Sequence, residues 1–143
     1  MITAVWKRFL ALPIWLKIIW ILCVCGLIIN TIALSRDMHN GAVLLRLHLG
    51  FFVLYAGQVV FILLGERLVW MLSLLQAFLA FISNFDFTFV PIVRATGAFV
   101  YALHGSFTVE EMEIYKYVFV SACFSLEILK TVLIFILTPA KSR

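Results

Sequence analysis

Long apolar runs separated by short polar turns are the main pattern along this chain. A membrane-spanning helix needs about 20 mostly apolar residues. Polar turns at residues 35–41 and 65–67 divide the first runs from one another. The pattern predicts four spans, at about residues 13–34, 42–64, 68–89 and 114–138. We therefore predict an all-α integral membrane protein, with a single transmembrane domain over residues 1–143 built as a four-helix bundle.

Two shorter segments lie outside these spans. Residues 91–104 would form a helix of only roughly 20 Å, too short to cross a bilayer, so we expect an interfacial or re-entrant segment between the third and fourth spans. Residues 1–12 include Trp6, Lys7 and Arg8, as in an amphipathic anchor on a membrane surface. Residues 85–89 alternate apolar and polar positions, which also fits a strand, but an open strand in lipid leaves its backbone groups unpaired.

The last helix has a clear start signal. Thr108 and Glu111 are spaced as a capping box, in which each side chain bonds the other residue's backbone N–H. A helix from Thr108 to Leu137 would be roughly 43 Å long, more than the hydrocarbon core. We therefore expect its first turns to protrude into water.

Composition supports lipid as the surrounding solvent. The chain is 65% hydrophobic and 13% charged, with a mean hydropathy of +1.15, whereas soluble domains are about 45–50% apolar and about 25% charged. The net charge of +4 comes from Lys and Arg at helix ends, and no basic patch suggests a nucleic-acid partner. Cys23, Cys25 and Cys123 lie in apolar stretches without the spacing of a redox pair or a metal site.

The distribution of Lys and Arg predicts the orientation, because cytoplasmic loops carry an excess of these residues. If the N-terminus is inside, the inner side holds Lys7, Arg8, Lys17, Arg67, Lys141 and Arg143. The outer side then holds Arg36, Arg46, Arg94 and Lys116. We predict that both termini are cytoplasmic and that the membrane is a bacterial inner membrane.

Glu127 and Lys130 are the most unusual residues within the predicted spans. An ionised side chain at the centre of a span costs roughly 2.5–3.5 kcal/mol on insertion scales. Their spacing of three residues puts both on one helix face, where they can pair. One interpretation is an ion pair that fixes helix assembly, and the other is a proton- or ion-coupled site.

Further polar residues within or near the spans are candidates for helix contacts. They are Asn30, Arg46, Gln58 and Gln76. Polar side chains bond across helix interfaces in lipid, so these positions fit either packing within the bundle or contact with a partner subunit.

A third set of residues maps to the predicted outer rim. It consists of His39, His48, His104, Asp37, Asp86, Glu110 and Glu111. Histidines and carboxylates can hold a catalytic zinc ion, but no fixed spacing links them. We therefore predict no catalytic, metal or cofactor site, and we keep an enzyme acting at the outer membrane face as the third hypothesis.

The leading functional hypothesis is a non-enzymatic membrane subunit that packs with other copies or with a different membrane protein. The alternative is a small oligomeric transporter or channel that uses Glu127 and Lys130, with Arg46 at the outer mouth. The expected surroundings are the bilayer and other membrane subunits.

Overall fold

The fold is made of helices alone over the part of the chain that is described. The computed structural model describes residues 1–38, 41–84 and 86–139, apart from the side chain of Asp37. The helices are α1 (Ile2–Ala11), α2 (Ile14–Asp37), α3 (Ala42–Leu64), α4 (Val69–Ser83), α5 (Val90–His104) and α6 (Val109–Leu137). These ranges contain no strand, so the predicted all-α class is confirmed.

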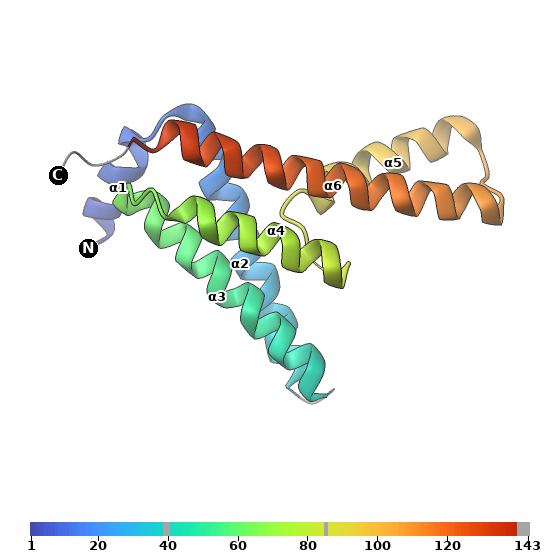
Figure 1. The fold of residues 1–143 in the computed structure, drawn as a ribbon, viewed down its shortest axis with the longest axis horizontal. Coiled ribbons are helices and arrows are strands. Elements are labelled where there is room, and N and C mark those ends of the chain that lie inside the picture. Colours follow the sequence, from blue (N-terminus) through green and yellow to red (C-terminus); the bar gives the residue numbers. More distant parts are fainter. Residues whose placement is uncertain (39–40, 85, 140–143) are drawn as a thin grey trace.

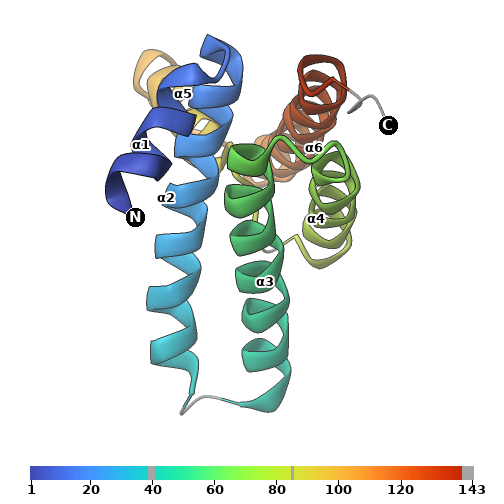
Figure 2. The ribbon, with the colours of Figure 1, turned by 90° about the vertical axis from the view of Figure 1, so that its left-hand side faces the viewer.

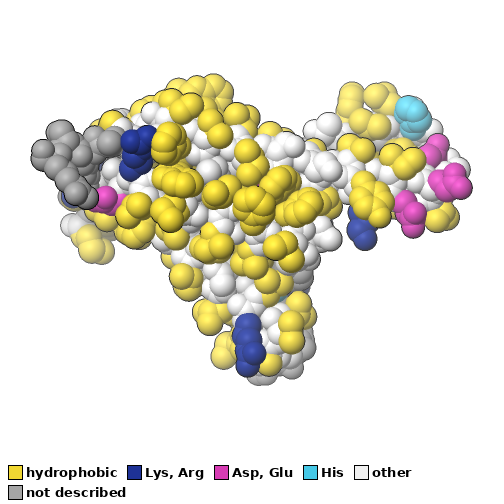
Figure 3. Space-filling view, viewed as in Figure 1, with side chains coloured by type: hydrophobic (Ala, Val, Ile, Leu, Met, Phe, Trp, Pro, Cys, Tyr) yellow, Lys and Arg dark blue, Asp and Glu magenta, His cyan; other side chains and the backbone are white. Residues whose placement is uncertain are grey.

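Three of the helices are long and apolar enough to cross a membrane. They are α2, α3 and α6, and no more than a third of the most apolar stretch of each is buried inside the chain. The remaining apolar surface faces outward, as Figure 3 shows for one side of the molecule. These helices therefore indicate an integral membrane protein.

The long helices run in two diverging directions (Figure 1). α2 and α3 form an antiparallel hairpin, and α4 packs against both α3 and α6. Figure 2 shows α2 and α3 side by side, with α4 next to α3, and α6 packs against α4. α1 packs against α3 and lies at the same end of the molecule as the last turn of α6.

Helix α4 is shorter than the sequence suggested. The expected span reached Phe89, but α4 has 15 residues and ends at Ser83, where Asn84 adopts a left-handed conformation with φ 50°. Asparagine tolerates this conformation better than most residues, and it ends the helix. Residues 86–89, which we call the return segment, are not helical, although Phe87 and Thr88 are buried. The chain thus turns back into the bundle before α5 begins.

Small side chains allow the close packing of α4. Ser73, Ala77 and Ala80 share one face of the helix and are fully buried, which is how helices approach closely in lipid. The turn before α4 depends on Gly65, whose φ of 67° ends α3 in a left-handed conformation that glycine adopts without strain.

α5 and the first part of α6 form an arm that projects from the bundle (Figure 1). We call α5 together with residues 109–119 the α5–α6 arm. Its helices touch at Gly97, where a Cβ would lie only 1.4 Å from the Tyr115 hydroxyl oxygen. The capping box predicted for Thr108 and Glu111 is confirmed, since both of its hydrogen bonds are present.

Candidate functional site: a buried polar centre

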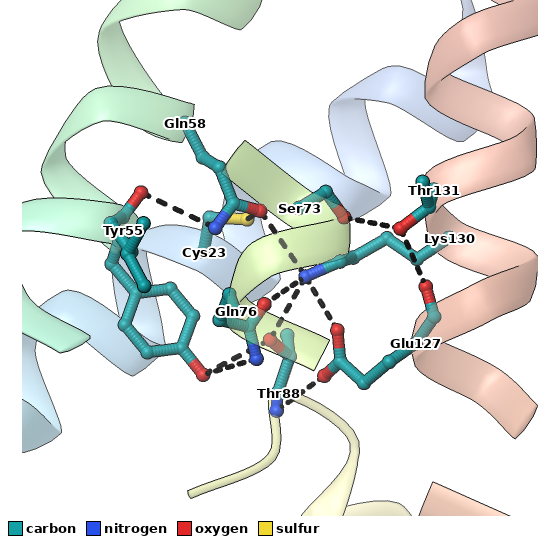
Figure 4. A network of polar contacts seen from close by, with 10 residues as sticks. Cys23, Tyr55, Gln58, Ser73, Gln76, Thr88, Glu127, Lys130 and Thr131 are labelled. Atoms are coloured by element: carbon teal, nitrogen blue, oxygen red, sulfur yellow. Dashed lines mark hydrogen bonds and ion pairs between the residues drawn. The ribbon is translucent and has the colours of Figure 1, made fainter. Parts of the chain in front are cut away.

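The ammonium group of Lys130 lies at the centre of a buried polar cluster (Figure 4). Its Nζ is 2.6 Å from Glu127 Oε2 and 2.6 Å from Gln76 Oε1. Gln58 Oε1 and Thr88 Oγ1 are also within reach, at 3.2 and 3.3 Å. Four oxygens therefore surround an ammonium group that has three N–H donors. We call these five residues the polar centre.

The helix faces explain how these side chains meet. Glu127 and Lys130 are three residues apart on α6 and share one face. Gln58 comes from α3 and Gln76 from α4, and Figure 4 shows both amides pointing from their helices toward the ammonium. The polar centre thus joins three helices through a single charged group.

Thr88 connects the polar centre to the return segment. Its backbone N–H donates to Glu127 Oε1 over 2.6 Å, and its hydroxyl lies 3.1 Å from the Tyr55 hydroxyl. The polar groups of buried non-helical backbone need hydrogen-bond partners from the protein or from ordered water. Glu127 meets that requirement here, because one carboxylate oxygen faces Lys130 and the other accepts from Thr88.

A second layer of contacts extends from the polar centre to its neighbours. Cys23 Sγ donates to Gln58 Oε1 at 3.6 Å, which brings α2 into contact with the cluster. The Ser73 and Thr131 hydroxyls are 2.8 Å apart and link α4 to α6. Gln76 Nε2 donates to the Tyr55 hydroxyl at 3.5 Å. Each of these side chains satisfies a polar neighbour that would otherwise be costly to bury.

The polar centre is closed to solvent within the chain. Glu127, Gln58 and Gln76 have no exposed surface, and Lys130 is 1% exposed. Removing two charges from water is unfavourable unless their partners are well placed. The short contacts of Lys130 and Glu127 provide such partners, so the arrangement can hold a charge pair away from water and fix the helices around it.

Asn30 and Asp86 form a separate contact between α2 and the return segment. The Asn30 amide donates to Asp86 Oδ2 and, over 3.0 Å, to the carbonyl oxygen of Gly26. Asn30 is buried, whereas Asp86 is partly exposed. This contact attaches the return segment to α2, as Thr88 attaches it to α3 and α6.

The remaining candidates are spread over several parts of the molecule. Arg46 is exposed near the start of α3, and His48, two residues further on, is buried. His104, Glu110 and Glu111 lie exposed at the far end of the α5–α6 arm. His39 and the side chain of Asp37 lie outside the described residues. Within the described ranges, no three His, Cys, Asp or Glu side chains are grouped closely enough to hold a metal ion.

Three members of this network were not predicted from the sequence. Tyr55, Thr88 and Thr131 all bond within it. A hydroxyl three or four residues from a polar residue on the same face is the available signal, as for Tyr55 before Gln58 and Thr131 after Glu127. Thr88 has no comparable signal, because its position depends on the early end of α4.

Comparison with known proteins adds no relative. No protein family, no curated protein and no solved structure matches this chain. The function of this chain is therefore inferred from its own geometry.

Proposed function

We propose that this chain is a non-enzymatic integral membrane subunit that packs into a larger membrane assembly, with copies of itself or with another protein. Within the chain, the polar centre holds the helices in place. The α5–α6 arm supplies the surface that meets the rest of the assembly.

The exposed apolar side chains of the arm are the observation that carries this proposal. α6 is about 43 Å long, and even at a tilt of about 20° it covers about 41 Å along the membrane normal, against about 30 Å of hydrocarbon. Its first turns then extend beyond the hydrocarbon core. Large apolar side chains are exposed at the end of α5 and in the first turns of α6. Leu103 is 71% exposed, Val109 80%, Ile114 63% and Tyr117 75%. A protein partner would cover apolar surface that lipid tails do not reach.

In this proposal α2, α3, α4 and α6 cross a bacterial inner membrane, α4 does so together with the return segment, and both termini are cytoplasmic. The shared location of α1 and the last turn of α6 supports an even number of crossings. Lys7 and Arg8 in α1 and Lys17 near the start of α2 lie at this end of the molecule, which is proposed to be cytoplasmic, in agreement with the positive-inside rule.

The test is the mass of the particle extracted in a mild detergent. We expect native mass spectrometry to give a particle clearly heavier than one 16.3 kDa chain. The double variant Leu103→Ser with Ile114→Ser should shift the particle toward a single chain. Ile29→Ser, a similar change on an exposed position in the middle of α2, should leave the mass unchanged. A wild-type particle that contains one chain and no partner would contradict the proposal.

A small oligomeric transporter or channel is the second candidate. Its support is the return segment, since transporters place ion sites where helices are interrupted at membrane depth. Glu127 would then carry the coupled proton or ion. Glu127→Gln should abolish flux in reconstituted vesicles, while Ser125→Ala on the exposed face of α6 should not. Equal flux in wild type and Glu127→Gln would exclude this candidate.

A further inference from the structure

A groove separate from the polar centre lies between α3 and α4. It has a volume of about 480 Å³, within the range of about 300–1,000 Å³ that is typical of small-molecule sites. Its apolar lining comes from Leu49, Gly50, Val53 and Leu54 of α3 and from Leu75 and Leu79 of α4. Arg46 is the charged residue of the lining.

The groove exists because α3 and α4 separate toward the start of α3. At Gly57 a Cβ would come within 2.9 Å of Leu72 Cδ1, so the helices are in close contact there. Two turns closer to the start of α3, a Cβ at Gly50 would meet its nearest neighbour, Leu79 Cδ2, at 3.9 Å. α4 then ends at Ser83 and the chain leaves for the return segment. The groove is therefore open toward Arg46.

Arg46 places a positive charge at the open end of this apolar groove. The residue is exposed, and it forms no ion pair with any side chain that the structure describes. Its guanidinium group has the planar donor geometry that binds phosphate oxygens in pairs. The adjacent start of α3 has no side-chain cap and no acidic residue in its first turn, so its positive helix end adds to the attraction for an anion.

The order of these features along the groove matches the order of chemical groups in a phospholipid. Arg46 lies one turn from the start of α3, near the membrane surface. Apolar side chains then continue from Leu49 to Leu54 toward the middle of the helix. A charged headgroup followed by an acyl chain shows the same sequence of polarity. A partner helix would have to bring its own acidic residue to Arg46 to match it equally well.

We propose that the α3–α4 groove binds one anionic phospholipid, with the phosphate at Arg46 and an acyl chain along Gly50, Val53 and Leu79. This binding is independent of the proposed assembly through the α5–α6 arm. Lipid in the groove fills the space where α3 and α4 separate.

The experiment is lipid titration of the purified wild-type chain followed by native mass spectrometry. The probes are phosphatidylglycerol and phosphatidylcholine with identical acyl chains. One arginine near the membrane surface favours an anionic headgroup by about fivefold. We therefore expect about five times more phosphatidylglycerol than phosphatidylcholine to remain bound at equal concentration.

Two variants and one control locate the lipid. Arg46→Gln should remove the preference for phosphatidylglycerol, and Arg36→Gln, an exposed arginine at the end of α2, should keep it. Gly50→Leu should reduce the retention of both lipids, because its side chain occupies the groove without a backbone clash.

Several results would overturn the lipid site. These are equal retention of the two lipids by the wild-type chain, a preference that survives Arg46→Gln, or a Gly50→Leu variant that retains both lipids normally. If Gly50→Leu changed the number of chains in the particle and left lipid retention as it was, the groove would be a protein interface and the lipid proposal would be wrong. A single-chain particle that still prefers phosphatidylglycerol would contradict only the proposed assembly.

Discussion

Replacing Lys130 by methionine removes the charge at the middle of the polar centre and keeps most of the apolar stem. The Glu127 carboxylate would then remain fully buried, with the Thr88 backbone N–H as its hydrogen-bond donor. Gln58 and Gln76 would each lose the donor that now faces their side-chain oxygens. The variant therefore leaves a buried charge without its counter-ion and the Gln76 oxygen without its donor, whereas Gln58 Oε1 keeps the Cys23 thiol.

The expected cost follows from the burial of this pair. Removing one partner of a buried ion pair typically destabilises a protein by about 3–5 kcal/mol. The hydrogen bonds from the ammonium to the two amide oxygens contribute less, because hydrogen bonds within membranes average about 0.6 kcal/mol each. We expect Lys130→Met to lower the free energy of unfolding by about 3–5 kcal/mol, with most of the loss coming from the stranded carboxylate.

A second substitution separates the charge from the hydrogen bonds. Adding Glu127→Gln to Lys130→Met removes the stranded charge, while the amide oxygen at position 127 can still accept from Thr88. The double variant should be more stable than Lys130→Met alone, by about 2 kcal/mol. The costs of the two single substitutions should therefore not add.

The assay is reversible unfolding in mixed micelles with increasing SDS, followed by circular dichroism. Ser125→Ala is the matched control on the same helix, because its hydroxyl is exposed and bonds only the Ser121 carbonyl oxygen. The control should change the free energy of unfolding by less than about 0.5 kcal/mol. If Lys130→Met costs no more than this control, or if the two single costs simply add, the ion pair does not stabilise the fold as argued.

Three further substitutions test other contacts. Gly97→Leu should separate the two helices of the α5–α6 arm, because a Cβ there would overlap the Tyr115 hydroxyl, and limited proteolysis should cut the arm faster than in wild type. Thr88→Val keeps the shape of the side chain but removes its hydroxyl contacts with Tyr55 and Lys130, and it should cost about 1 kcal/mol in the SDS assay. Gly26→Leu would push against the Tyr55 ring, which a Cβ would approach to 2.8 Å; a lower midpoint of thermal unfolding is expected, and an unchanged midpoint would show that the ring can move aside.

The sequence predicted the long helices well because their signals are local. The expected spans at 13–34 and 42–64 overlap α2 and α3 almost completely. The start of α6 was predicted from Thr108 and Glu111 alone, since a capping box involves only neighbouring residues. Composition was enough to identify an integral membrane protein.

The end of α4 could not be predicted in the same way. Residues 84–89 have enough apolar character to continue a span, and no proline lies between residue 68 and Pro91 to stop the helix earlier. The chain can turn back because distant residues form hydrogen bonds with the polar groups of the return segment. Glu127 accepts from the Thr88 N–H, and Asn30 donates to Asp86. These partners lie 39 and 56 positions away in the sequence, so a local pattern carries no information about them.

The candidate site also has one part that local sequence signals predict and another part that depends on contacts between distant helices. Glu127, Lys130, Gln58 and Gln76 were each conspicuous as polar residues in apolar helices, and the structure brings them together around one ammonium group. Spacing along α6 predicted that Glu127 and Lys130 share a face. Nothing in the sequence shows that amides from α3 and α4 meet at that face, because this depends on how the helices cross.

The polar centre lies where the two diverging helix pairs meet, which connects it to both proposed contact surfaces. Gln58 belongs to the α2–α3 hairpin, Gln76 to α4, and Lys130 to α6, which continues into the α5–α6 arm. A single ammonium group thus fixes the angle between the hairpin and the arm. Because four oxygens surround its three N–H groups, the ammonium can exchange one acceptor for another while all of its donors stay bonded. The polar centre therefore holds α3, α4 and α6 together through acceptors that all three helices supply.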